Sequence, residues 1–310
     1  MTALNNLWRC AVPVATIWTS PASARDIDVD GTGNPVNLVK WLEALQYKER
    51  LDLCEANRVQ TQLLYGEEVI VDEIIDDWAK IVAIHQPSTK DQRGYPGWVP
   101  LTQLIESNGS ESKKYAIITA DKAQLWTEDE MPLLVLPFNT ILPLRDESLK
   151  YYHVDTPNGK AYLSKNGVEI TSSRATGNPT TMEQAVIKGT AFLDLPYFWG
   201  GMSSYGYDCS GFTYNMAKAS GIIIPRDAGE QKEAGQAIDK ENPDEWLIGD
   251  LLFFANDFGR APVRHVGFYF GEGKMIHSPQ TGKTVEIIHL TGTKFEEELC
   301  GVSRYQAELG

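Results

Sequence analysis

Three residues in the last third of the chain have the types and spacing of a thiol catalytic site. Cys209 stands in an Asp-Cys-Ser-Gly-Phe run at 208–212, and two histidines, His265 and His277, follow it. Nucleophilic attack on a carbonyl by a thiol needs a base and a polar group that orients this base. The sequence therefore predicts Cys209 as the nucleophile, His265 as the base and His277 as the orienting group.

A helix is predicted to begin at Cys209. Asp208 can cap its N-terminus, apolar residues follow at helical spacing, and Gly221 suits the position just after its C-terminus. A cysteine in the first turn lies at the positive end of the helix dipole, which lowers the pKa of the thiol. We expect a reactive thiolate at Cys209, whereas the other three cysteines are expected to be buried and inert.

The two histidines are predicted to lie on the strands of one hairpin, at 264–270 and 274–278. A three-residue connection, Gly271-Glu272-Gly273, pairs Phe270 with Lys274 and places His277 on the face of His265. A two-residue connection would place His277 on the opposite face. The geometry of this turn is therefore a test of the proposed site.

Two other interpretations of the cysteine and the histidines stay open from the pattern alone. They could bind a metal ion, or they could be ordinary core residues. No carboxylate or second thiol stands at metal-ligand spacing from them. We therefore predict no metal and no other cofactor.

Composition excludes several classes of function. The chain has 310 residues and a net charge of −14, and the phosphate backbone of nucleic acids demands a basic surface, so nucleic-acid binding is not expected. No apolar run of about 18 residues exists, so no membrane span is expected. The first residues lack the basic and apolar regions of a signal peptide, which favours a cytoplasmic location.

The N-terminal half contains a weak internal duplication. Residues 15–19 (ATIWT) resemble residues 123–127 (AQLWT), and each is followed by short strands separated by turns. This pattern is typical of small all-β barrels, which we place at 8–107 and 115–174. The first copy has two insertions, a helix-like stretch at 38–45 and a loop at 86–96. Long loops on a small barrel often carry specificity.

A third domain is predicted at 178–310, after a linker at 176–179. Its first helix has a capping pattern around Thr181. The domain contains all three residues of the predicted thiol site.

In this domain the chain resembles the NlpC-type cysteine peptidases. The matching stretches cover most of residues 180–302 and are 197–201 (YFWGG), 208–212 (DCSGF), 224–227 (IPRD), 249–254 (GDLLFF), 265–267 (HVG) and 275–277 (MIH). The resemblance implies a papain-like α+β catalytic domain, in which the nucleophile lies on a helix packed against an antiparallel sheet. It also implies that the two upstream all-β barrels are SH3-like.

Two stretches of the first barrel, 61–67 and 93–98, resemble the γ-D-glutamyl-L-diamino acid endopeptidases. That subgroup trims murein peptides whose L-alanine amine is free. The resemblance therefore implies a substrate of the form L-Ala-γ-D-Glu-diamino acid, cut after D-Glu.

The same resemblance assigns residues to the substrate. Tyr197 matches a tyrosine near the oxyanion. The residues matched to the peptide and to its amine are Asp208, Ser210, Arg226 and Asp227 in the third domain, and Tyr95 with Glu67, or its neighbour Glu68, in the first barrel. Ala228 stands where relatives often have serine, so one substrate hydrogen bond is expected to be missing or replaced.

These observations predict a cytosolic, metal-independent cysteine peptidase that recycles cell-wall peptides. Two alternatives belong to other functional classes. One is a wall-binding protein with a degenerate enzyme domain, and the other is a thiol acyltransferase or amidase on the same fold.

Overall fold

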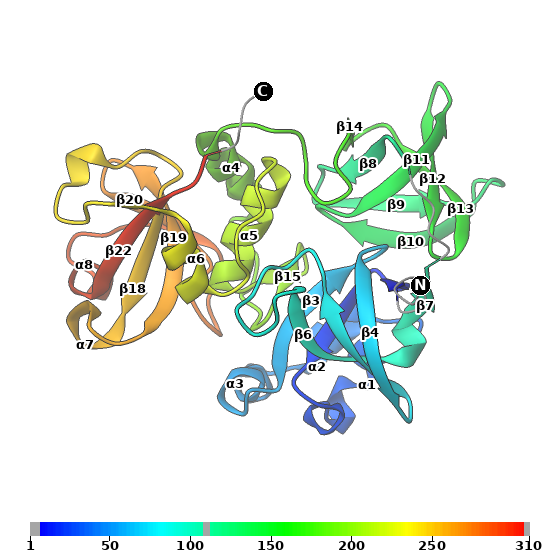
Figure 1. Ribbon diagram of the computed structural model, residues 1–310, viewed down its shortest axis with the longest axis horizontal. Helices are drawn as coiled ribbons and strands as arrows, with labels where there is room; N and C mark the ends of the chain where they lie inside the picture. The colour runs from blue at the N-terminus through cyan, green and yellow to red at the C-terminus, as the bar shows by residue number, and fades with distance from the viewer. Residues whose placement is uncertain (1–6, 108–111, 307–310) are drawn as a thin grey trace.

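The computed structural model describes residues 7–107 and 112–306, which form three domains (Figure 1). Two domains are built of β-strands, and the third combines helices with a sheet. We name them the first β domain, the second β domain and the third domain. Within the described residues no helix is long and apolar enough to cross a membrane.

The first β domain contains a seven-stranded antiparallel sheet in the order β3-β2-β6-β5-β4-β1-β7. Its strands are β1 (Leu7–Cys10), β2 (Val14–Trp18), β3 (Val59–Leu64), β4 (Glu68–Ile75), β5 (Trp78–Ala83), β6 (Tyr95–Pro100) and β7 (Leu104–Glu106). The helical segments are η1 (Pro21–Ser23), η2 (Asp26–Asp28), α1 (Val29–Thr32), α2 (Leu38–Ala44), α3 (Tyr47–Glu55) and η3 (Leu101–Gln103).

The helix predicted in the first insertion is confirmed as α2. The Asn37 side chain caps it by accepting a hydrogen bond from the Lys40 amide. Trp41 on this helix is fully buried and packs against Trp18 of β2 and Phe198 of the third domain. The insertion thus fixes the first β domain against the third.

The second β domain repeats the topology of the first. Its strands are β8 (Tyr115–Ile118), β9 (Lys122–Trp126), β10 (Pro132–Pro137), β11 (Ile141–Glu147), β12 (Tyr151–Thr156), β13 (Gly159–Ser164) and β14 (Val168–Thr171). Their order, β10-β9-β13-β12-β11-β8-β14, is that of the first sheet with each strand replaced by its equivalent. The predicted duplication is therefore confirmed, with ATIWT on β2 and AQLWT on β9.

The third domain contains a six-stranded antiparallel sheet in the order β17-β22-β18-β19-β20-β21. The strands of this sheet are β17 (Gln236–Ile238), β18 (Leu251–Ala255), β19 (Val263–Gly271), β20 (Lys274–His277), β21 (Glu286–His289) and β22 (Leu299–Arg304). Two further strands, β15 (Met202–Ser203) and β16 (Gly206–Tyr207), pair with each other in a separate two-stranded sheet. The helices are α4 (Met182–Gly189), η4 (Thr190–Phe192), α5 (Cys209–Ala219), α6 (Ala228–Ala234), η5 (Pro243–Glu245), α7 (Asn256–Gly259) and α8 (Lys294–Glu298). Thr181 caps α4 as predicted, by accepting from the Gln184 amide at 3.2 Å.

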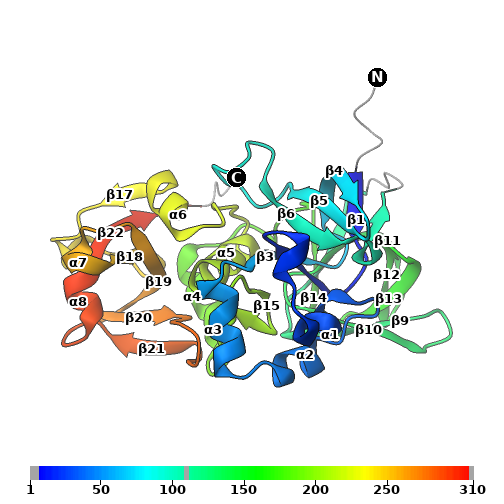
Figure 2. The ribbon, with the colours of Figure 1, turned by 90° about the horizontal axis from the view of Figure 1, so that it is seen from below.

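Helix α5 lies at the centre of the molecule, between the sheet of the third domain and the two β domains (Figures 1 and 2). Every residue of α5 is buried. Phe212 packs on Phe268 of β19, while the Asn139 side chain of the second β domain donates to the Asn215 carbonyl of α5 at 2.7 Å. A residue at the start of α5 is therefore positioned by contacts from several directions.

The predicted pairing of Phe270 with Lys274 is wrong. Lys274 pairs with Gly271, so only Glu272 and Gly273 form the turn, and both have positive φ. A two-residue turn alone would move His277 to the other face, but the register shifts between Tyr269 and Gly271. This irregularity restores the pairing of Phe268 with Ile276, and His277 reaches the face of His265 by a different route.

Candidate active site

Cys209 is the first residue of α5, as predicted. The Asp208 carboxylate accepts a hydrogen bond from the Gly211 amide at 2.6 Å and so caps the helix. Gly221 follows the helix with a φ of 86°, the left-handed conformation expected after a C-terminus. A Cβ atom on Gly211 would stand 2.1 Å from the Gly201 carbonyl oxygen, so only glycine permits this close packing of the first turn.

The two predicted histidines are in contact. His265 on β19 and His277 on β20 are buried, and His265 Nε2 lies 2.7 Å from His277 Nδ1. The Phe295 ring of α8 packs against both imidazoles. The Val266 backbone amide, next to His265, lies near the Cys209 sulfur and acts to lower the pKa of its thiol. The structure thus brings the thiol to the strand that carries the base.

Glu286 extends this series of polar groups. It stands directly opposite His277 in the pairing of β20 with β21, and its Oε1 lies 3.4 Å from His277 Nε2. The His277 side chain is fully buried, whereas the Glu286 side chain is 39% exposed. Nothing in the sequence singles out Glu286, because only the pairing of a third strand places it beside His277.

The expectation of a thiolate at Cys209 is wrong for this structure. Burial, together with the negative charge of Asp208, raises the pKa of the Cys209 thiol to about 12. Burial, together with the charges of His277, Arg264 and Lys294, holds the pKa of His265 well below its ordinary value. Burial thus disfavours both charged forms, the Cys209 thiolate and the His265 imidazolium.

Asp208 is locked in position by Arg226. The guanidinium donates to both Asp208 oxygens, at 3.2 and 2.6 Å, and to Ser210 Oγ at 2.8 Å. Its Nε donates to Thr61 Oγ1 on β3 at 2.8 Å. Burial alone would lower the pKa of Arg226, but the Asp208 carboxylate outweighs it and raises the pKa. This network ties the first turn of α5 to the first β domain.

Tyr95 and Asp227 meet across the boundary between the first β domain and the third domain. The buried Tyr95 hydroxyl lies 3.1 Å from both oxygens of Asp227 and donates to this carboxylate. Asp227 immediately precedes α6, yet its side chain does not cap the helix. Lys90, from the predicted loop insertion, also donates to Tyr95 Oη and lies 3.0 Å from Asp227 Oδ2. We name Tyr95, Asp227 and the neighbouring Gln60 the acceptor cluster.

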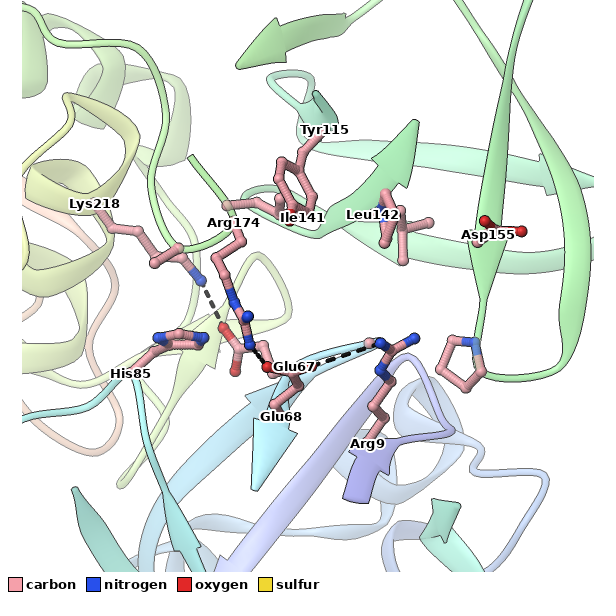
Figure 3. A pocket seen from close by; sticks show the side chains of 14 residues that line it. Arg9, Glu67, Glu68, His85, Tyr115, Ile141, Leu142, Asp155, Arg174 and Lys218 are labelled. Carbon is pink, nitrogen blue, oxygen red and sulfur yellow. Dashed lines mark hydrogen bonds and ion pairs between the residues drawn. The ribbon is translucent and has the colours of Figure 1, made fainter. Parts of the chain in front are cut away.

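Glu67 has its own ion-pair partner, Lys218, as Figure 3 shows. Its carboxylate accepts from Lys218 Nζ at 2.6 Å and from the Leu64 amide at 3.0 Å. Lys218 is near the far end of α5, roughly 13 Å along the helix from Cys209 at 1.5 Å per residue. The neighbouring Glu68 pairs with Arg9 and Arg174. The structure therefore brings neither glutamate to the predicted amine position, where Gln60 lies instead.

Two further predicted residues are Tyr197 and Ala228. Tyr197 is buried, and burial and the nearby Cys209 raise the pKa of its hydroxyl well above the ordinary value. Ala228 is the first residue of α6, next to Asp227. In residues 7–107 and 112–306, no group of three or more His, Cys, Asp or Glu side chains has an arrangement that could hold a metal ion.

Comparison with protein families gives two matches. Residues 194–304 match the NlpC/P60 family, and residues 118–170 match the YKFC SH3b2 domain. The first match includes Cys209, His265, His277 and Glu286. The second lies within the second β domain.

Similar proteins extend over almost the whole chain. The gamma-D-glutamyl-L-lysine dipeptidyl-peptidase of Bacillus subtilis (strain 168) is 41% identical over 296 residues, which cover 95% of this chain and 97% of the relative. The protein of the same name from Bacillus cereus (strain ATCC 10987 / NRS 248) is 41% identical over 300 residues, with 95% and 89% covered. A crystal structure of an NlpC/P60 family protein from Bacillus cereus ATCC 10987 superposes with a TM-score of 0.92 at 40% identity, covering 97% of this chain and 100% of that one.

Proposed function

Because this chain belongs to the NlpC/P60 family, we propose that it is a cysteine peptidase that cleaves L-Ala-γ-D-Glu-diamino acid peptides after D-Glu. The names of the two relatives similar over its full length support this substrate class. The contact between Cys209 and the strand of His265, continued by His277, carries the proposal. In this interpretation the third domain is a papain-like α+β unit and the β domains are SH3-like barrels.

The tautomers of the two histidines follow from their contacts. His265 Nε2 faces His277, so His265 Nδ1 is the nitrogen left to accept the Cys209 proton. Nε2 of His265 must then carry a hydrogen and donate to His277 Nδ1. His277 in turn carries its hydrogen on Nε2, which points toward the Glu286 carboxylate. The negative charge of Glu286, 3.4 Å from His277 Nε2, favours a hydrogen on this nitrogen and so the tautomers that make His265 a base.

Acylation begins when Nδ1 of His265 takes the thiol proton and the Cys209 sulfur attacks the γ-carbonyl of D-Glu. The Cys209 backbone N–H, in the first turn of α5, and the Tyr197 hydroxyl would stabilise the oxyanion. Protonated His265 then gives its proton to the departing amine of the diamino acid. Water, deprotonated by His265, cleaves the thioester and releases L-Ala-D-Glu.

The acceptor cluster suits the N-terminal ammonium of L-Ala. It offers the Asp227 carboxylate, the Tyr95 hydroxyl and the Gln60 carbonyl oxygen, whereas a carboxylate at this position would be repelled. A peptide still attached to muramic acid has no free amine there. A requirement for the amine would restrict the enzyme to released peptides, as murein peptide recycling demands.

The test is mass-spectrometric analysis of products from L-Ala-γ-D-Glu-L-Lys and from its N-acetylated form. We expect L-Ala-D-Glu from the free-amine peptide only, and none with Cys209→Ala. Cleavage of both peptides would contradict the amine requirement. Turnover by Cys209→Ala would contradict the thiol mechanism, and failure to cleave either peptide would favour an acyltransferase or a wall-binding protein.

A further inference from the structure

The acceptor cluster is occupied by a cation from the protein itself. Lys90 Nζ donates to Tyr95 Oη, lies 3.0 Å from Asp227 Oδ2 and donates to Gln60 Oε1 at 3.2 Å. An ammonium group has three N–H donors, and the cluster supplies three oxygen acceptors. Lys90 is therefore bound as the N-terminal amine of a peptide would be bound.

The acceptor cluster is held in place more firmly than the Lys90 side chain that occupies it. Tyr95 is 2% exposed, and the Asp227 side chain is 35% exposed. The preceding residue, Arg226, is buried, and its guanidinium donates hydrogen bonds to Thr61 and Asp208. The Lys90 side chain is 41% exposed and comes from a loop. Because it lies on a flexible four-carbon stem, Lys90 can leave the cluster without moving the backbone.

The loop that carries Lys90 is attached to the third domain independently of the lysine. Glu230 on α6 accepts hydrogen bonds from the Thr89 amide at 3.0 Å and from Thr89 Oγ1 at 2.5 Å. The Pro87 carbonyl accepts from the Arg226 amide at 3.1 Å. These bonds keep the loop beside the cluster when the ammonium of Lys90 is displaced.

We propose that Lys90 is a built-in competitor that occupies the acceptor cluster of the resting enzyme and is displaced by the N-terminal ammonium of the substrate. This inference rests on the proposed function, since it assigns the cluster to the peptide amine. One cation replaces another, so the Asp227 carboxylate stays paired throughout the exchange. A neutral N-acylated peptide cannot make this exchange, and Lys90 thus sharpens the selection for a free amine.

Competition by Lys90 should lower the apparent affinity of the enzyme for free-amine peptides. A ligand that binds only the open form has its apparent affinity reduced by the fraction of open form. Removal of the competitor should therefore tighten the binding of free-amine peptides and leave the chemical step unchanged. It should also allow N-acylated peptides, which cannot displace a lysine, to bind at the acceptor cluster.

The experiment compares wild type with Lys90→Met, which keeps the length of the side chain and removes its charge. For L-Ala-γ-D-Glu-L-Lys we expect KM to fall about two- to five-fold, the size of an exposed ion pair, with kcat unchanged. The ratio of kcat/KM between this peptide and its N-acetylated form should become smaller. Lys90→Gln should act in the same direction, and Lys160→Met, an exposed lysine of the second β domain, should change neither value.

A KM that is unchanged or higher in Lys90→Met and Lys90→Gln would overturn the inference while leaving the peptidase intact. If wild type cleaves neither peptide, the proposed function fails separately. Calorimetric titration of L-Ala-γ-D-Glu then decides the role of Lys90 without turnover. Tighter binding to Lys90→Met than to wild type would support it, and equal, weaker or absent binding would reject it.

Discussion

The thiol of Cys209 illustrates how burial competes with local electrostatics at a single residue. A position in the first turn of a helix favours the thiolate, but the pKa is raised to about 12 because the sulfur is buried and Asp208 is negative. Replacement of Asp208 would reduce stability, because this residue caps α5 and pairs with Arg226. The raised pKa disfavours a thiolate in the resting enzyme, so in the proposed mechanism proton transfer to His265 accompanies the attack on the substrate.

Glu286 is the residue whose role can be tested most directly. We expect Glu286→Ala to lower kcat about ten-fold with KM unchanged, less than the roughly 100- to 10,000-fold that a general base contributes. Loss of the Glu286 negative charge should lower the pKa of the His265–His277 pair further, because its protonated form loses a favourable partner. The positive charges of Lys294 and Arg264 already act in this direction. The acid limb of the kcat/KM profile should therefore move to lower pH.

Glu286→Gln keeps an acceptor for His277 Nε2 and should recover part of kcat. Glu272→Gln, at an exposed turn of the same sheet, serves as the matched control. A purely structural role would be indicated by lower activity without any movement of the acid limb, or by a rise in KM that accounts for the whole loss.

At the scale of elements, the position of Cys209 depends on the contact between the first turn of α5 and the segment before β15. The Asp208 amide donates to the Gly201 carbonyl at 3.2 Å, and the same carbonyl faces Gly211. Asp208 Oδ2 also accepts from the Gly200 amide at 2.9 Å. The helix therefore packs directly on backbone, and its first turn has no room for another side chain.

Gly211→Ala should destabilise the protein and lower activity, because the added Cβ would stand 2.1 Å from the Gly201 oxygen. Overpacking of this kind costs about 1–3 kcal/mol. Gly229→Ala on α6 is the matched control, since a Cβ there meets nothing within 4 Å and alanine is the better helix former. Urea unfolding measures the loss of stability, and kcat measures the loss of activity. Equal stability of the two variants would contradict this account of the packing.

At the scale of the whole molecule, the site is shared between domains. Thr61 of the first β domain accepts from Arg226, and Met202, which precedes the nucleophile, donates its amide to Gln62 Oε1 at 3.0 Å. Trp199 donates to the Val59 carbonyl at 3.0 Å. The first β domain thus contacts the segments around Cys209 and contributes two of the three residues of the acceptor cluster, Gln60 and Tyr95.

The buried histidines should make the folded state sensitive to mild acid. Burial, with a contribution from Lys294, lowers the pKa of His277 from 6.5 to about 3. The unfolded chain therefore binds a proton near pH 6.5 that the folded chain does not bind. Stability is complete above this pH and falls by about 1.4 kcal/mol per pH unit as pH decreases through the window from 6.5 to 3.

Urea unfolding at pH 7.5 and at pH 5.5 measures this slope, in a range above the ordinary pKa of most carboxylates. His277→Asn should flatten the slope by about the contribution of one histidine, and His289→Asn, at an exposed position, should not. An unchanged slope in His277→Asn would show that His277 does not carry the effect.

The sequence by itself determined the features that depend on neighbours along the chain. The start of α5 followed from Asp208 and helical spacing, α4 followed from Thr181, and the two β domains followed from a repeat whose strands have the same order in both copies. Cys209, His265 and His277 were predicted from their residue types and spacing, and the resemblance of the surrounding residues to a known family supported this prediction.

Only the tertiary structure decided the features that depend on packing between distant segments. The pKa of Cys209 is set by burial, which local sequence does not reveal. A register shift beside a two-residue turn, rather than a three-residue connection, places His277 beside His265. Strand pairing places Glu286 beside His277, and contact between domains places Lys90 beside Asp227. Glu67 instead pairs with Lys218 of α5, a contact between residues 151 positions apart that local sequence does not reveal.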